Sequence, residues 1–373
     1  MFKNLKKNNL IKFSYSLKLT AVCLLLLSIL TVWGTIYQAD NGLYAAKLKF
    51  FTSWFFLIFG FIPFPGAALV MTILFLNLVS SLLFRINFAL KNIGNILTHL
   101  GIIILLLGGF FTFFFSQETV LTLKEGGSSS WSNSYNNWEL SVWKDINGER
   151  IFSDVDLRYI SPGKEINLDQ IGINVKIENY YENALAFRNN RNNKREIINA
   201  SGIYSIEKKK NELEPAGNIP GLLFKESKTG KNIVLYGGES NPTSLNSGGS
   251  VYNFFLRKRR SRLPLHLRLI DFRIEHYPGS SIVKSYESQV EIEHEGLKRE
   301  VLISMNRPLR YKDFTFFQSS YQIAQNGTEY SVLAVVKNSG RLLPYISSII
   351  IFLGMLIHFI IMLFRKKKEK TEK

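Results

Sequence analysis

The stretch LTHLGIIILLLGGFFTFFF, residues 97–115, decides the fold class of this chain. It contains no Asp, Glu, Lys or Arg, and Ile96 extends it to a twenty-residue uncharged run. An α-helix needs about 20 mostly apolar residues to cross the hydrocarbon core of a bilayer. The stretch therefore predicts a membrane-spanning helix, and a single histidine, His99, lies near one end of it.

Three other stretches of the 373-residue chain reach or approach spanning length, at residues 19–37, 67–84 and 343–364. The first is too long for the core of a signal peptide, and the sequence YQAD follows it in place of a small-residue cleavage site. We therefore expect four retained spans, with 96–115 as the third, and an integral membrane protein.

Basic residues set the expected orientation. They precede the first span, occupy the loop between the second and third as Arg85 and Lys91, and follow the fourth as RKKKEKTEK. By the positive-inside rule all three flanks face the cytoplasm, and a long translocated domain does not have to obey that rule. We expect a cytoplasmic-membrane protein with both termini inside and with residues 38–66 and 116–342 outside.

The first outer loop is short but apolar. Its sequence FFTSWFFLIFGFIPFPG, residues 50–66, is too short to span and has two prolines near its end. Such a stretch indicates an interfacial or re-entrant segment. Trp33, Tyr37 and Trp54 are expected at the headgroup level, where amphipathic rings are enriched.

Residues 116–342 predict one large, mainly β domain inserted between spans three and four, with a sandwich of two sheets as one arrangement. Residues 173–181 alternate apolar and polar side chains, 288–305 reads as a hairpin turning at Glu295-Gly296, and 328–337 as a further strand. Residues 124–134 read as a linker and 237–250 as a loop. The chain thus divides into a three-span N-terminal membrane domain (1–115), the β domain (116–342) and a C-terminal span with a basic tail (343–373).

Soluble catalytic or metal chemistry has little support in the sequence. The single cysteine, Cys23, excludes an internal disulfide, a CxxC site and a CxxCH site, and GxSxG, Walker and HExxH motifs are absent. His276 and His294 read better as solvated strand histidines than as ligands. The basic run RKRRSR, Arg257–Arg262, reads as a solvated loop or as a site for anionic headgroups or ligand carboxylates.

The two membrane histidines are the best functional candidates, because ionisable side chains in spans are costly. At 1.5 Å per residue, His99 lies roughly 5–9 Å and His358 roughly 9 Å inside the cytoplasmic boundary. They could be axial ligands of one haem, ligands shared with different partners, or structural hydrogen-bonding groups, and the structural alternative is stronger for His358. Gly101 and Gly108-Gly109 would let another helix approach span three closely.

The order of these segments resembles the ResB-like family of System II cytochrome c biogenesis. The resemblance rests on WGTIYQ (33–38), LTHLGIIILLLGG (97–109), LPLHLRLIDFRIEHYPG (263–279) and SMNRPLRYKDFTFFQSSYQ (304–322). Within the last segment the matching residues are Asn306, Pro308, Leu309, Tyr311, Phe317, Gln318 and Tyr321. We expect this segment to pack near a partner at the membrane face of the domain or to be ordinary β-core.

The resemblance implies work with a CcsA- or ResC-like multispan protein that carries a tryptophan-rich segment. Together such subunits move haem b across the membrane and present it, as reduced Fe(II) haem, to the CxxCH thiols of apocytochrome c. His99 matches the family's membrane histidine and would ligate the iron, with His358 as the second candidate. The resemblance also implies a thioredoxin-like thiol reductase as a partner. It implies no nucleic-acid partner.

Some family members carry a cysteine proposed to hold haem, but the only thiol here, Cys23, lies within the first span. No enzymatic centre of the chain's own is expected, so ligation would belong to the partner. The alternative function is a haem-free outer scaffold that holds apocytochrome or thiol-reducing proteins for that partner. An unrelated membrane-anchored sensor is a third, weaker possibility.

Overall fold

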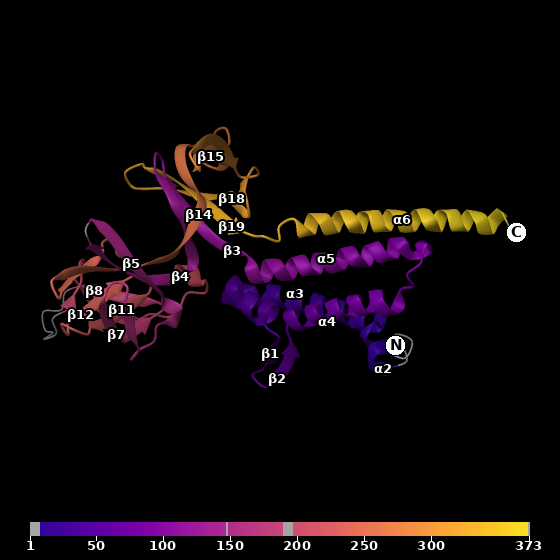
Figure 1. Cartoon of the computed structure of the whole chain (residues 1–373), viewed down its shortest axis with the longest axis horizontal. Helices are drawn as coiled ribbons and strands as arrows, with labels where there is room; N and C mark the ends of the chain where they lie inside the picture. Colours follow the sequence, from indigo (N-terminus) through magenta and orange to yellow (C-terminus); the bar gives the residue numbers. More distant parts are fainter. Residues whose placement is uncertain (1–7, 147, 189–196, 372–373) are drawn as a thin grey trace. The chain divides into compact units, whose positions relative to one another are not determined.

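The computed structural model describes residues 8–146, 148–188 and 197–371, and side-chain surroundings as far as Arg365. The chain divides into a helical unit, Met1–Gln117 with Lys337–Lys373, and a β unit, Glu118–Val336 (Figure 1). Lys3, Lys6 and Lys7, which entered the orientation prediction, lie outside the described residues, as do the last two residues of the tail.

The helical unit contains four helices that are long and apolar enough to cross a membrane, counted over the described residues. Each contains one of the predicted spans, so the four-helix expectation is confirmed at the level of length and composition. The described helical segments are α2 (Asn9–Ser14), α3 (Leu17–Ala46) continued by a π-helix (Lys47–Thr52), α4 (Ala67–Ser80) continued by a π-helix (Ser81–Arg85), a 3₁₀ turn (Leu90–Asn92), α5 (Ile93–Phe115) and α6 (Leu343–Thr371).

Helix α3 continues well beyond the predicted span, and the chain then turns back along it. Gly42 has φ 81° inside α3, a left-handed conformation that breaks the helix. The π-helix that follows returns along α3, so that a Cβ on Gly34 would lie 2.8 Å from Phe51 Cε2. Phe50 is buried there between the rings of Trp33 and Tyr37.

The apolar loop between α3 and α4 forms a β-hairpin, β1 (Phe55–Ile58) and β2 (Ile62–Pro65). Figure 1 shows it projecting sideways from the helices of its unit. Phe56 and Phe64 pack against Trp33, whereas Phe59 at the tip is 86% exposed.

The two prolines of β2 keep hydrogen-bond donors off its free edge. Pro63 and Pro65 lie opposite Leu57 and Phe55. Proline has no N–H, so the pairs that exchange hydrogen bonds must be Phe56–Phe64 and Ile58–Ile62. The backbone positions of β2 that face away from β1 are therefore the prolines, and that edge offers only carbonyl groups.

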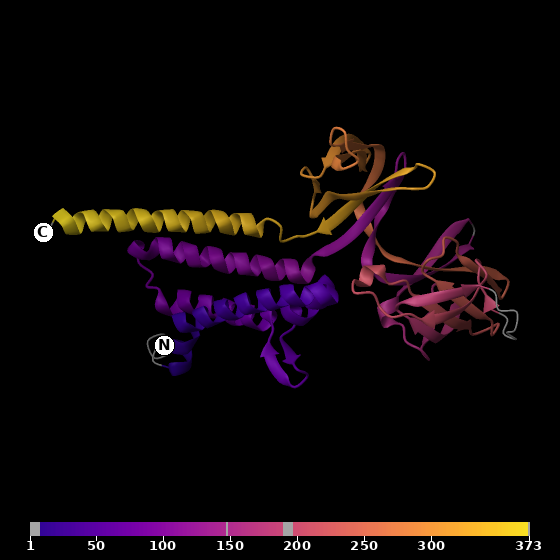
Figure 2. The same cartoon turned by 180° about the vertical axis from the view of Figure 1, so that it is seen from behind.

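Helices α5 and α6 are antiparallel and in close backbone contact (Figures 1 and 2). Gly94, Gly101 and Gly108 recur every seven residues on one face of α5. A Cβ on Gly94 would lie 2.5 Å from the backbone nitrogen of His358, and one on Gly101 would lie 2.6 Å from Ile351 Cγ1. A Cβ on Gly109 would meet nothing within 4 Å, so the expected close approach occurs at Gly101 and Gly108 but not at Gly109.

The β unit consists mainly of strands, as expected, and its sheets are mainly antiparallel. A ten-stranded sheet has the order β16-β15-β14-β4-β3-β19-β18-β17, with β13 on β14 and β5 on β4; β6-β7-β11-β12-β9 form a second sheet and β10-β8 a pair. The strands are β3 (Gln117–Lys124), β4 (Ser128–Ile146), β5 (Glu149–Asp156), β6 (Glu165–Leu168), β7 (Ile173–Tyr181), β8 (Ala184–Arg188), β9 (Ile197–Ile198), β10 (Ile203–Lys208), β11 (Gly221–Glu226), β12 (Asn232–Tyr236), β13 (Thr243–Ser247), β14 (Ser250–His276), β15 (Val283–His294), β16 (Leu297–Ser304), β17 (Leu309–Tyr311), β18 (Phe314–Ile323) and β19 (Glu329–Lys337). The three predicted strand regions are β7, the β15–β16 hairpin and β19.

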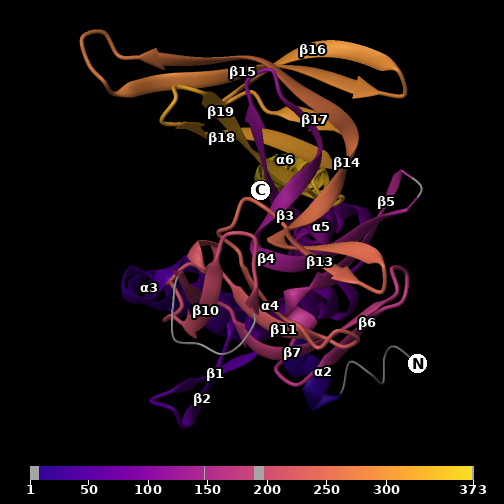
Figure 3. The same ribbon diagram turned by 90° about the vertical axis from the view of Figure 1, so that its left-hand side faces the viewer.

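Two hydrophobic cores lie within the β unit, and β14 passes through both (Figure 3). The first is a sandwich of the five-stranded sheet against β4 and the first half of β14, with Phe224 and Phe254 in ring contact across it. The second lies among β3, β15–β19 and the other half of β14. The sandwich prediction therefore describes only the first core.

Three loop predictions in the β unit were wrong. Residues 124–134 contain only a short turn before β4 begins at Ser128, residues 237–250 contain β13, and Arg257–Arg262 lies inside β14. Strands pair through backbone hydrogen bonds, so a strand can contain polar side chains when these have hydrogen-bond partners. Ser132, for example, is buried and accepts a hydrogen bond from Thr119 Oγ1 at 2.8 Å.

Candidate functional site

His99 is held by a hydrogen bond within its own helix. It is half-buried six residues after the start of α5, and its Nδ1 lies 2.9 Å from the carbonyl oxygen of Asn95. A carbonyl only accepts hydrogen bonds, so Nδ1 carries a proton, and in the neutral form of the ring the lone pair is on Nε2. Metal-binding histidines are commonly oriented in this way.

The helix geometry directs His99 away from α6. His99 follows Gly94 by five residues and precedes Gly101 by two, and both glycines face α6. At 3.6 residues per turn it lies roughly 140–160° around α5 from that contact. His358 is placed differently, with its backbone nitrogen against Gly94 and its ring against Phe359. The α5–α6 pair therefore does not bring the two histidines together at one point.

This arrangement offers one imidazole ligand from α5 and no space for a haem between α5 and α6. Over residues 8–146, 148–188 and 197–371, no three His, Cys, Asp or Glu side chains gather as a metal site would require. A six-coordinate haem iron bound at His99 Nε2 would need its other axial ligand from elsewhere, because haem iron in cytochromes takes two.

Gln318, from the segment 304–322, belongs to the second core. Its side chain is 6% exposed; Oε1 accepts a hydrogen bond from Ser288 Oγ at 2.7 Å, and Nε2 donates to Ser331 Oγ at 3.2 Å. Phe316 beside it is fully buried, whereas Phe317 points outward. Of the two interpretations, β-core holds for Gln318.

The other matching residues of that segment are spread over its turn and strands. Asn306 is exposed and Pro308 half-buried between β16 and β17. Tyr321 packs against Phe272 and Tyr286, with ring centroids 5.9 and 5.4 Å away. Tyr311 ends β17, and its ring lies edge-on to His294 at 5.4 Å. That last contact joins two residues that no sequence pattern paired.

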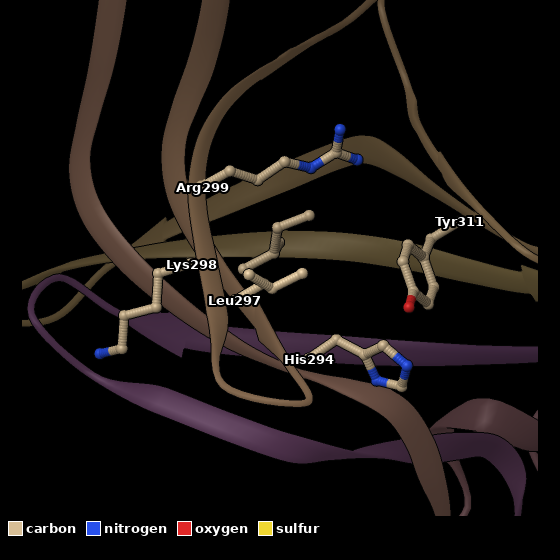
Figure 4. Close-up of a pocket in the computed structure, with 6 residues that line it drawn as sticks. His294, Leu297, Lys298, Arg299 and Tyr311 are labelled. Carbon is tan, nitrogen blue, oxygen red and sulfur yellow. The ribbon is translucent and has the colours of Figure 1, made fainter.

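Tyr311 and His294 lie side by side in the wall of a pocket of about 310 Å³ (Figure 4). His294 ends β15, and its Nε2 lies 3.2 Å from Glu295 Oε1. Lys298 points away from Tyr311 in the figure and pairs with Glu291 and Glu293. The lining residues are Ile292, His294, Leu297, Lys298, Arg299 and Tyr311.

Much of the basic run on β14 is neutralised inside the β unit. Arg257 pairs with Glu139 at 2.8 Å and Asp154 at 3.0 Å, and Arg259 with Asp156 at 3.3 Å. Burial raises the pKa of Glu139 despite its bond to Arg257. Because these cations already have internal partners, the run is a structural feature more than an anion site.

Lys258, in the same run, is half-buried and bonded to backbone carbonyl groups. Its Nζ donates to the carbonyl oxygens of Tyr135 at 2.7 Å and Ala216 at 3.2 Å and lies 4.5 Å from the centre of the Trp138 ring. Burial lowers the pKa of Lys258 to about 8. No carboxylate pairs with it among the described ion pairs.

A comparison with known proteins now gives the family. The family model described as ResB-like matches residues 89–332 of the chain, from just before α5 to β19. The chain belongs to the ResB-like family. A curated relative, protein NrfI of Wolinella succinogenes, is 34% identical over 96 residues, which are 25% of this chain and 10% of that protein. The ResB-like match includes His99, His294 and the segment 304–322.

Proposed function

We propose that this ResB-like chain acts in cytochrome c biogenesis as a haem-handling subunit. With a CcsA- or ResC-like multispan partner it would take haem b across the cytoplasmic membrane and present it, reduced, to apocytochrome c. Haem is cargo in this proposal, and His99 Nε2 is one axial ligand.

The state of His99 carries the proposal. Its Nδ1 is hydrogen-bonded to the Asn95 carbonyl, which leaves Nε2 as the nitrogen that the neutral ring would offer to iron. The half-buried ring lies on the side of α5 away from α6, the side on which Phe110 contacts Phe75 of α4, so a haem or a partner helix would approach beside α4. A ligand from the partner would complete the iron's coordination and make haem binding depend on the complex.

The test uses the full-length chain purified in complex with its multispan partner. We expect His99→Ala to leave the complex intact while the absorption of reduced haem is lost or shifted and maturation of a reporter cytochrome c fails. Added imidazole should partly restore the haem spectrum, because it can occupy an open iron position. It cannot replace the hydrogen bond that the His99 ring makes to the Asn95 carbonyl within α5.

His358→Ala is the matched control. The backbone of His358 packs against Gly94, on another side of α5 from His99, so we expect the haem spectrum of this variant to resemble that of the parent complex. A normal haem spectrum together with normal maturation in His99→Ala would contradict the ligand assignment. That result would favour the haem-free scaffold, in which the β unit holds apocytochrome or thiol-reducing proteins.

A further inference from the structure

The pocket at the β15–β16 tip is an extension of the second core that the chain leaves uncovered. Directly opposed residues of a hairpin share one face, and the pairs here are Ile292 with Arg299 and His294 with Leu297. Ile292 is buried in the core, but Leu297 on the same face is 80% exposed. Strand β17 ends at Tyr311, so the face continues outward without a covering strand.

The backbone beside this pocket is also free. Strand β16 is at one end of the ten-stranded order, and its described pairing along Leu297–Arg299 is with β15 alone. In a two-residue hairpin the closing pair, here His294 and Leu297, exchanges hydrogen bonds. The N–H and C=O groups of Lys298 and Glu300 therefore point away from β15, toward the open edge.

The charge at the pocket mouth is mixed but has one uncommitted cation. Lys298 lies on the other face of the hairpin, where Glu291 and Glu293 neutralise it. Glu295 lies beside His294. Arg299 shares the pocket face, is exposed, and forms none of the described ion pairs. A guanidinium in this setting favours a ligand that carries a carboxylate.

These features select the occupant. A volume of about 310 Å³ is at the lower end for small-molecule sites and suits one large side chain. A free strand edge binds extended polypeptide through main-chain hydrogen bonds, while an adjacent pocket reads alternate side chains. We propose that an extended segment of a partner polypeptide adds a strand to β16 at Lys298 and Glu300. One of its apolar side chains enters the pocket, and an acidic residue two positions away pairs with Arg299.

The test measures peptide binding to the full-length chain in phospholipid nanodiscs. The probes are fluorescent octapeptides of Thr and Val in which one central position takes each of the twenty residues and the position two away is Glu or Lys. We expect the tightest binding with a large apolar residue and Glu. N-methylation of the peptide backbone should weaken it at least tenfold, about 1.4 kcal/mol, because it removes the pairing N–H groups.

Arg299→Glu provides the charge-swap variant. It should weaken the Glu peptides about tenfold and improve the matching Lys peptides, a reversal that misfolding would not produce. Arg310→Glu is the control: Arg310 is also exposed, precedes Tyr311 and lies on the opposite strand face, so it should change nothing.

Several outcomes would overturn the inference. The first is that no peptide binds more tightly than its N-methylated form. The second is that Arg299→Glu and Arg310→Glu have equal effects. The third is that a second copy of the chain occupies the β16 edge in solution. None of these results depends on haem, so the inference and the proposed function can fail separately.

Discussion

The two hairpins β1–β2 and β15–β16 have loops of three and two residues, and each loop begins with a non-glycine residue and then a glycine at positive φ, but the side chains on their arms differ in character. Phe59-Gly60 has φ values of 53° and 83°, and Glu295-Gly296 has 50° and 79°. The first hairpin exposes aromatic rings and belongs to the helical unit, whereas the second carries alternating charges and belongs to the β unit. The turn conformation is therefore set locally, whereas the side chains on the two strands match the surroundings of each hairpin.

The same contrast runs through both units. The helical unit uses glycine for contact between helices, and its hairpin has proline where free donors would otherwise face outward. Lipid offers no hydrogen bonds, so an open strand edge is tolerated only near water or protein. The β unit instead contains the buried Gln318 and the half-buried Lys258, both of which have hydrogen-bond partners within the unit.

The largest effect is expected at the α5–α6 contact. Gly101→Leu would force a side chain into backbone, since even a Cβ would lie 3.0 Å from the nitrogen of Ile351. We expect loss of the α5–α6 pairing and a fall in accumulated protein, because the overpacked helix cannot relax locally. Gly109→Leu, on an open face, is the matched control, and accumulation in membranes is the measurement. Equal accumulation of the two variants would contradict the contact.

A smaller loss is expected from the buried polar network of the β unit. Gln318→Ala removes the amide partner of Ser288 and Ser331, which keep only their mutual hydrogen bond, and a lost hydrogen bond costs about 0.5–1.5 kcal/mol. The midpoint of thermal or denaturant unfolding of the β unit should fall accordingly. Phe317→Ala, at the exposed neighbouring position, should change it far less. An unchanged midpoint in Gln318→Ala would mean that the network contributes little to stability.

The same substitution can be compared at the glycine of each turn. Gly60→Ala and Gly296→Ala meet no atom within 4 Å, so only the left-handed backbone conformation opposes them. Each should cost about 1–2 kcal/mol. Limited proteolysis at each hairpin in membranes would compare them. A much larger effect in one hairpin would show that its turn is constrained by more than local conformation.

The smallest effect concerns pH. The pKa of Lys258 is about 8 in the folded β unit, below its ordinary value of 10.5, so the unfolded chain binds more protons between those values. Stability should therefore rise as the pH increases from about 8 to about 10.5, because unfolding then requires proton uptake. Lys258→Met should flatten this dependence relative to Lys298→Met, whose parent lysine has a pKa raised by Glu291. The same slope in both variants would exclude Lys258 as its source.

Much of this architecture was predictable from periodicity. The four spans, β7, the turn at Glu295-Gly296 and β19 all followed from local patterns that the structure retains. The predictions that failed were those in which pairing with a distant strand decided the local structure. Ser128–Ser134 has the composition of a linker but forms a strand because it pairs with β14, more than a hundred residues later. His99 was identifiable as an ionisable residue in an apolar span, although its hydrogen bond to Asn95 required the structure. The His294–Tyr311 contact could not be anticipated, because nothing in either segment specifies the register that joins them.

The pairing of β3 with β19 has a consequence for synthesis. These strands are the first and last of the β unit, and about 200 residues separate them in the chain. At elongation rates of 5–20 residues per second, β3 waits roughly 10–40 s for its neighbour. During that interval β3 and the partly built sheet around it present an unpaired edge. The yield of mature protein would therefore depend on proteases and chaperones that act during this interval. Those that act on the folded protein would have less effect.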